Sequence, residues 1–113
     1  MKTFKDLLFE AHKFGKGGVH ASRKFENGNY ISVVGGGKDF FLKGNGKTSF
    51  EIMSSVTEKR PMGVECWLSP EQVTQRMRYL QIKDKKESVG IEEESKDYDS
   101  AFRPTFKERF NYE

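Results

Sequence analysis

Glycine and lysine recur through residues 35–48 in an order close to that of a phosphate-binding loop. Residues 46–48 form the Gly-Lys-Thr triplet that ends such a loop, in which backbone amides cradle the phosphates and the lysine reaches them. The loop also needs a glycine five positions before this triplet, and Phe41 stands there. The glycine pattern of dinucleotide-binding proteins fails too, because Phe40 and Ser49 occupy the positions of its third glycine. The stretch therefore predicts a flexible, basic contact surface and not a catalytic site.

Side chains suited to metal binding or nucleophilic catalysis are few. The soft ligands are His12, His20 and Cys66, and no two of them stand at a zinc-like spacing. Cys66 and a histidine could form a nucleophilic pair, but Cys66 falls in a strand that we expect to be buried, where a thiol is inert. His12 is expected on the polar side of a helix, as a solvated side chain. The sequence predicts no metal, no cofactor and no catalytic residue, so we expect the protein not to be an enzyme.

The glycine-rich stretch has two interpretations. As structure, it is a long hairpin connection whose glycines allow turns and whose lysines keep an exposed edge soluble, with residues 40–42 as an extra strand packed inward. As a binding surface, it offers cations to phosphates while an aromatic ring stacks on a base or fills a pocket on a protein. A nucleotide signal held by the same stretch is a further alternative. The candidate nucleic-acid-binding residues are Arg23, Lys24, Lys38, Lys43 and Lys47.

Local patterns predict the elements that must position these side chains. Apolar residues at helical spacing predict a first helix over Thr3–Phe14. The Asn-Gly pair at 27–28 is typical of a hairpin turn, because both residues tolerate positive φ. A capping box that starts at Ser69, with proline at the first helical position, begins a second helix that ends near Lys83. The strands are expected at about 21–26, 29–35, 49–56 and 64–68.

The apolar spacing also predicts which faces are buried. On the second helix, the buried stripe is marked by Val73, Met77 and Leu80, and Arg76 lies largely off it. In the last strand, the apolar residues at 66–68 break strict alternation and predict burial near the end of the strand.

Together these elements predict an α+β fold. We expect an antiparallel sheet of three to four strands with an N-terminal helix and a second helix packed on one face, plus a polar C-terminal extension. Residues 1–83 would form the compact domain, and residues 84–113 an acidic linker followed by an aromatic tail. The sequence leaves three alternatives for the aromatic tail: docking on its own sheet, association with a symmetric mate, or insertion into a partner's groove. The candidate partner-binding residues are Phe40, Phe41, Phe102, Arg103, Phe106 and Phe110.

Composition bounds the compartment and the partners. The chain has 113 residues, a net charge of +3 and a single cysteine, which excludes an internal disulfide and fits a reducing compartment. No apolar run approaches the roughly 18 residues that a transmembrane helix needs, and the first residues do not form a signal peptide. We therefore expect a cytoplasmic protein with no membrane partner. A homodimer would cover an exposed face or edge of the sheet.

The order of hairpin, strand and capped helix carries a resemblance. Residues 23–34, 49–52 and 64–73 resemble small accessory proteins of tailed bacteriophages, which have an aromatic-x-Asn-Gly hairpin, a further strand and a short strand entering a capped helix. The resemblance covers about residues 22–80 and implies a protein made in the cytoplasm of the infected host bacterium. It implies a non-enzymatic role in host takeover or anti-defence, as an inhibitor or modulator that binds a bacterial host or defence protein. Nucleic-acid binding, or sequestration of a nucleotide signal, is the alternative.

Overall fold

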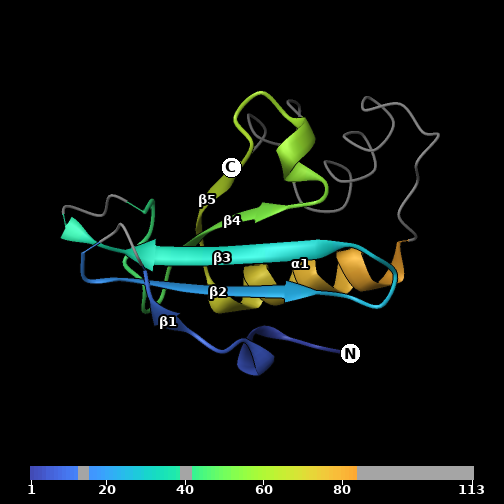
Figure 1. Cartoon of the computed structure of the whole chain (residues 1–113), viewed down its shortest axis with the longest axis horizontal. Coiled ribbons are helices and arrows are strands. Elements are labelled where there is room, and N and C mark those ends of the chain that lie inside the picture. The colour runs from blue at the N-terminus through green and yellow to red at the C-terminus, as the bar shows by residue number, and fades with distance from the viewer. Residues whose placement is uncertain (13–15, 39–41, 84–113) are drawn as a thin grey trace, which may run out of the picture.

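The computed structural model describes residues 1–12, 16–38 and 42–83. In this part of the chain five strands form one antiparallel sheet in the order β1-β2-β3-β4-β5, so that each strand pairs with its neighbour in sequence (Figure 1). The strands are β1 (Glu10–Ala11), β2 (Gly18–Lys24), β3 (Tyr30–Gly36), β4 (Phe50–Ser54) and β5 (Glu65–Leu68). The described helices are α1 (Pro70–Ile82) and the short 3₁₀ helices η1 (Phe4–Asp6) and η3 (Thr57–Lys59). The expected α+β class with an antiparallel sheet is confirmed. The sheet has five strands where three to four are expected, because part of the segment predicted as a helix forms β1, and the described residues contain one α-helix where two are expected.

The N-terminal segment is extended over most of its length, so the prediction of a helix over residues 3–14 is wrong. After the single turn η1, the segment continues through Leu7, whose φ of −76° and ψ of 134° are extended, into β1. Leu7 is buried, Leu8 is 85% exposed and Phe9 packs on the core. This alternation follows the two-residue period of an extended chain. The ring of Phe9 lies 5.4 Å from that of Phe50, and this packing against the sheet decides the conformation.

Helix α1 begins where the sequence predicts. The amide of Ser69 donates to Gln72 Oε1 at 2.9 Å, and the amide of Gln72 donates to Ser69 Oγ at 3.2 Å, which completes the capping box. The predicted apolar stripe is buried, but Arg76, expected largely off it, is buried as well. Its Nη2 donates to Oε2 of Glu65 in β5 at 3.0 Å, so an ion pair joins the helix to the sheet. Neither α1 nor any other helix of the described residues is long and apolar enough to cross a lipid bilayer.

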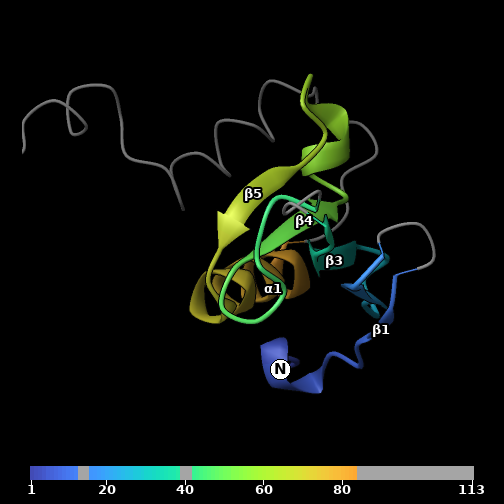
Figure 2. The same cartoon turned by 90° about the vertical axis from the view of Figure 1, so that its left-hand side faces the viewer.

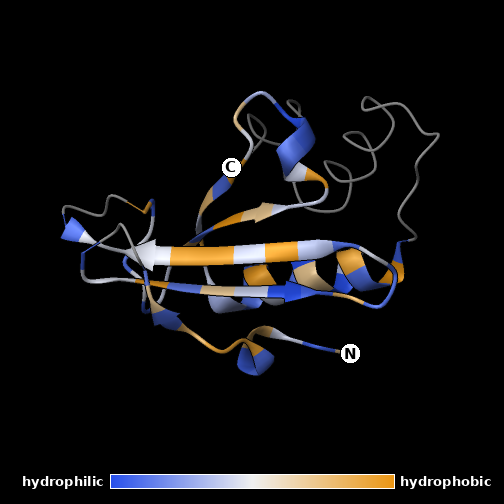
Figure 3. Ribbon diagram, in the orientation of Figure 1, coloured by the Kyte–Doolittle hydropathy of each residue, from blue (hydrophilic) through white to orange (hydrophobic). Residues whose placement is uncertain are grey.

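The sheet curves around α1. Figure 2 shows β5, β4, β3 and β1 along an arc on one side of the helix, with the N-terminal segment on another side of it. Side chains alternate along each strand, so Ile31 and Val33 of β3 and Ile52 of β4 face the helix and are fully buried. Figure 3 shows the hydrophobic residues of β3 and of the turns of α1 behind it. The core therefore lies between the sheet and α1.

The β2–β3 hairpin caps the C-terminal end of α1. The predicted Asn-Gly turn is present, with Gly28 at φ 90°. Asn27 Nδ2 donates to the carbonyls of Leu80 and Lys83, both at 2.8 Å, and Asn29 Nδ2 donates to the same two carbonyls at 2.8 Å. The last carbonyls of a helix accept no hydrogen bond from within the helix, so they need donors from elsewhere. The hairpin turn thus also fixes the end of α1.

Candidate functional site

The glycine-rich stretch forms a hydrogen-bonded turn over residues 42–49, where the sequence predicts a flexible surface. Asn45 Oδ1 accepts hydrogen bonds from the amides of Lys47, Thr48 and Ser49 at 2.8, 2.7 and 3.0 Å. Successive amides that point at one oxygen form the kind of concavity that holds an anion in phosphate-binding loops. Here the carboxamide of the same turn occupies that position, so these three amides already have their acceptor and do not cradle a phosphate.

The glycines of this stretch allow close backbone packing. A Cβ on Gly35 would lie 2.7 Å from the Cα of Gly46, and a Cβ on Gly44 would lie 2.6 Å from the carbonyl oxygen of Ser49. Only a residue without a side chain permits such approaches. Leu42 is buried, as the structural interpretation expects, although it lies in a turn and not in a strand. The described part of the stretch therefore supports the structural interpretation of its glycines.

The five candidate nucleic-acid-binding cations do not share one surface. Arg23 and Lys24 lie at the end of β2 that leads into the hairpin turn. Lys38, Lys43 and Lys47 lie beyond the opposite end of the hairpin, between β3 and β4. β2 has 7 residues, so at about 3.3 Å per residue the two groups stand roughly 20 Å apart. The described residues thus form two separate basic groups and not one groove.

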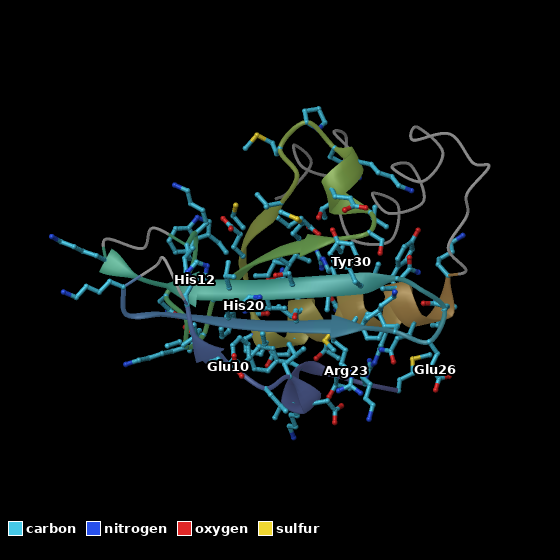
Figure 4. The ribbon with its side chains drawn as sticks, in the orientation of Figure 1. Glu10, His12, His20, Arg23, Glu26 and Tyr30 are labelled. Atoms are coloured by element: carbon cyan, nitrogen blue, oxygen red, sulfur yellow. The ribbon has the colours of Figure 1, made fainter. Side chains whose placement is uncertain are left out.

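Arg23 and Lys24 line a cavity of about 530 Å³. Its walls come from the N-terminal segment, the β2–β3 hairpin and the last turn of α1, and they include Lys2, Glu26 and Gln81. In Figure 4, Arg23 and Glu26 lie toward the hairpin end of the molecule. Lys2 and Gln81 stand 79 positions apart in the chain. No local sequence signal joins residues so distant, so the sequence reasoning missed this cavity.

Trp67 of β5 is exposed, whereas the sequence predicts burial for residues 66–68. Its side chain is 54% exposed, and its φ of 59° is a left-handed value that bulky residues rarely adopt. The register of β4 and β5 shifts between Phe50 and Ile52, so two residues of β5 face one residue of β4. Such a bulge re-aims a side chain. The amide of Trp67 donates to the carbonyl of Lys43 at 3.0 Å, so a backbone hydrogen bond joins the bulge to the glycine-rich stretch.

Two exposed methionines belong to the same part of the chain as Trp67. Met53 of β4 is 42% exposed, and Met62, in the connection between η3 and β5, is 79% exposed. Tryptophan and methionine are enriched in protein–protein interfaces relative to the rest of the surface. Met53, Met62 and Trp67 are exposed and come from β4, β5 and the connection between these strands, and we call these three residues the β4–β5 surface.

Cys66 lies beside Glu51. Its Sγ donates to Oε1 of Glu51 at 3.9 Å. Burial raises the pKa of the Cys66 thiol, and the Glu51 carboxylate raises it further, whereas Lys43 acts in the opposite direction. Burial also raises the pKa of Glu51. A thiol of raised pKa is a weak nucleophile at neutral pH. Cys66 itself is half-buried, whereas the sequence predicts a buried position.

The two histidines lie side by side where β1 leads into β2 (Figure 4). The ring centroids of His12 and His20 are 6.2 Å apart, and the rings meet edge to face at 88°. His12 follows a strand, so the expectation that it stands on a helix is wrong. Among the described residues, no three His, Cys, Asp or Glu side chains form a group that could hold a metal ion.

The described fold is that of a small α+β domain, a five-stranded antiparallel sheet wrapped around one helix. The chain matches no protein-family model, no curated protein and no solved structure. Its function therefore has to be inferred from its own surfaces.

Proposed function

We propose that this protein is a non-enzymatic binding protein that docks on another protein through the β4–β5 surface. The observation that carries the proposal is the conformation of Trp67. A left-handed backbone costs a non-glycine residue about 1 to 2 kcal/mol, and such outliers cluster at functional sites. Trp67 combines this cost with a side chain that is 54% exposed. A partner would gain a large aromatic anchor from this exposed ring.

The contact is made by side chains and not by strand addition. The edge strand β5 has 4 residues and is bulged, and the opposite edge strand β1 has 2 residues. Short and bulged edges prevent pairing with another strand, which also disfavours a homodimer formed edge to edge. Trp67 is the anchor, because a few buried aromatic residues supply most of the binding energy of an interface. Met53 and Met62 add apolar contacts, because their flexible side chains adapt to the shape of a partner.

The partner that we propose is a protein of a bacterial host. The resemblance of about residues 22–80 to small accessory proteins of tailed bacteriophages supports this choice. The three residues of the β4–β5 surface are apolar, and the nearby charges of Glu51 and Lys43 are of opposite sign, which favours a protein over a nucleic acid. Docking would inhibit or modulate a host or defence protein in the host cytoplasm. Six partner-binding residues expected from the sequence lie outside the described residues and stay predictions: Phe40, Phe41, Phe102, Arg103, Phe106 and Phe110.

A nucleic-acid-binding function has less support. Its five candidate cations form two groups at opposite ends of β2, and the amides of the glycine-rich stretch are bonded to Asn45. Binding of a single strand usually combines a continuous basic groove with stacking aromatic rings. A steep fall of affinity with salt would be the signature of this alternative.

The test is a pull-down from bacterial lysate, with and without nuclease, read by mass spectrometry. Trp67→Gly and Leu8→Ala form a matched pair, because each removes one exposed apolar side chain from a different part of the surface. Glycine adopts the left-handed backbone of residue 67 without strain, so this variant keeps the bulge. We expect one host protein to be retained by the wild type and by Leu8→Ala, with or without nuclease, and lost from Trp67→Gly.

Two outcomes of the pull-down would overturn the proposal. If Trp67→Gly captures the same protein in equal amount, the β4–β5 surface is not the binding site. If the captured material is lost when nuclease is added, the nucleic-acid alternative is favoured. Urea denaturation of the variants provides the control for folding. We expect Trp67→Gly to change the free energy of unfolding by about 1 kcal/mol, whereas a loss above about 3 kcal/mol would make Trp67 a core residue.

A further inference from the structure

The cavity at the hairpin end contains an arginine that forms no hydrogen bond or ion pair within the described structure. Arg23 follows Val19 and Ala21 on the face of β2 that packs on the core, so strand alternation directs it toward α1 and the N-terminal segment. Its side chain is partly buried and lines the cavity. A guanidinium group carries five N–H donors in a planar fork. These donors are therefore available to a molecule in the cavity.

Hydrogen bonds between distant segments hold the walls of the cavity. The amide of Lys2 donates to Gln81 Oε1 at 2.8 Å, and Gln81 Nε2 donates to the carbonyl of Lys2 at 2.7 Å. On the hairpin side, Asn27 Nδ2 is bonded to carbonyls at the end of α1. Hydrogen bonds thus hold the N-terminal segment and the hairpin to α1 around the cavity. Small-molecule sites are usually pre-formed in this way.

Charged side chains of both signs line the cavity. They are Lys2, Arg23, Lys24, Asp6 and Glu26. The Asp6 carboxylate accepts a hydrogen bond from the amide of Thr3 at 2.8 Å. That bond, and then the nearby Lys2 and Arg23, hold the pKa of Asp6 below its usual value, so Asp6 is negatively charged at neutral pH. The cations therefore exceed the carboxylates, and the cavity favours a ligand with an anionic group and with hydrogen-bond donors.

We propose that this cavity binds a phosphate-bearing small molecule of about the size of a nucleotide. Arg23 holds the phosphate with two parallel hydrogen bonds, and Lys2 and Lys24 add positive charge. A phosphate monoester offers three acceptor oxygens to the paired donors of Arg23, one more than a carboxylate. Glu26 accepts a hydrogen bond from a hydroxyl or amino group elsewhere on the ligand. The volume of about 530 Å³ lies within the usual range of small-molecule sites.

This site is separate from the β4–β5 surface and does not depend on the proposed protein-binding function. It also differs from the phosphate loop that the sequence suggests, because the cavity lies at the hairpin end of β2 and the glycine-rich stretch at the other end.

The experiment is isothermal titration calorimetry of the full chain with AMP, inorganic phosphate and adenosine. We expect AMP to bind, inorganic phosphate to bind more weakly and adenosine to give no signal. Arg23→Gln should weaken AMP binding roughly 10-fold or more, because hydrogen bonds to a charged group are lost. Lys47→Gln removes the same charge at the other end of the sheet and should leave AMP binding unchanged. Arg23→Lys keeps the positive charge but not the planar arrangement of N–H donors, so it should weaken AMP binding less than Arg23→Gln does.

Four results would overturn the proposal. These are no AMP binding at millimolar concentration, adenosine binding as tightly as AMP, equal weakening by Arg23→Gln and Lys47→Gln, and equal affinity for AMP and inorganic phosphate. The last of these would remove the role assigned to Glu26. Circular dichroism of each variant checks that the fold is retained. Trp67→Gly should bind AMP like the wild type, so failure at this site is distinguished from failure of the protein-binding proposal.

Discussion

The backbone amide of Trp67 donates a hydrogen bond of 3.0 Å to the carbonyl oxygen of Lys43. This bond joins the left-handed residue of β5 to the glycine-rich stretch, and that stretch in turn packs on β3 where Gly46 meets Gly35. The stretch therefore supports the backbone of the exposed tryptophan. Two unusual features of the sequence, the glycines and the single tryptophan, are parts of one arrangement.

Gly35→Ala should destabilise the fold and disturb Trp67. The added Cβ would lie 2.7 Å from the Cα of Gly46, and two backbones packed in this way cannot separate without moving the stretch. We expect a loss of about 1 to 3 kcal/mol in the free energy of unfolding, measured by urea denaturation, and a changed tryptophan emission. Gly63→Ala is the control, because its Cβ meets no atom within 4 Å and only its positive φ adds strain. A Gly35→Ala protein with native stability and emission would contradict the close packing.

The ion pair between Arg76 and Glu65 should behave as a unit. Both side chains are 5% exposed, so removal of one partner leaves a charge buried away from water. We expect Arg76→Met alone to cost about 3 kcal/mol or more, and the double variant Glu65→Leu/Arg76→Met to cost less than the sum of the two single changes. A double-mutant cycle by denaturation measures this coupling. Arg78→Met, on the exposed side of α1, serves as the control, and strictly additive losses would argue against a coupled pair.

The hydroxyl of Tyr30 should make the fold sensitive to high pH. Burial, and then the hydrogen bond that Tyr30 donates to Glu58, raise the pKa of Tyr30 from 10.0 to about 12. The folded state holds this proton more tightly than the unfolded state, so the stabilisation is fully present below pH 10.0 and is lost as the pH rises through about 12. Denaturation over this range should show a larger loss for the wild type than for Tyr30→Phe. Parallel losses would mean that the pKa of Tyr30 is not raised.

The reactivity of Cys66 should depend on Glu51. Burial and the neighbouring carboxylate both raise the pKa of the thiol, so little thiolate is present near pH 8. Glu51→Gln removes the negative charge and should lower the pKa of Cys66, which speeds alkylation by iodoacetamide several-fold. Mass spectrometry follows the reaction, with Glu26→Gln as the control far from the cysteine. An unchanged or slower rate in Glu51→Gln would show that the carboxylate does not act on the thiol.

Local signals were sufficient to predict most of the sheet and α1. The Asn-Gly pair at 27–28 forms the predicted turn, and the capping box at Ser69 begins the predicted helix. In both cases a few adjacent residues fix the backbone, so the information is contained in a short stretch of sequence.

The remaining features depend on contacts between distant residues. The spacing of apolar residues before β1 fits a helix as well as an extended chain, and packing against Phe50 decides between them. Exposure of Trp67 follows from a bulge, which alternation along one strand does not reveal. The cavity joins Lys2 to Gln81, and the separation of the cations follows from strand register. For the candidate site, the sequence therefore supplied Arg23 and Lys24 but not the neighbours that surround them.

Fluorescence quenching of Trp67 tests docking through the β4–β5 surface most directly, because this residue is the single tryptophan of the chain. Acrylamide quenching is measured for the purified protein alone and in complex with the host protein captured in the pull-down. We predict efficient quenching of the protein alone, since the side chain is 54% exposed, and protection with a blue-shifted emission in the complex. A complex that forms and leaves both the quenching and the emission of Trp67 unchanged would contradict the proposed interface.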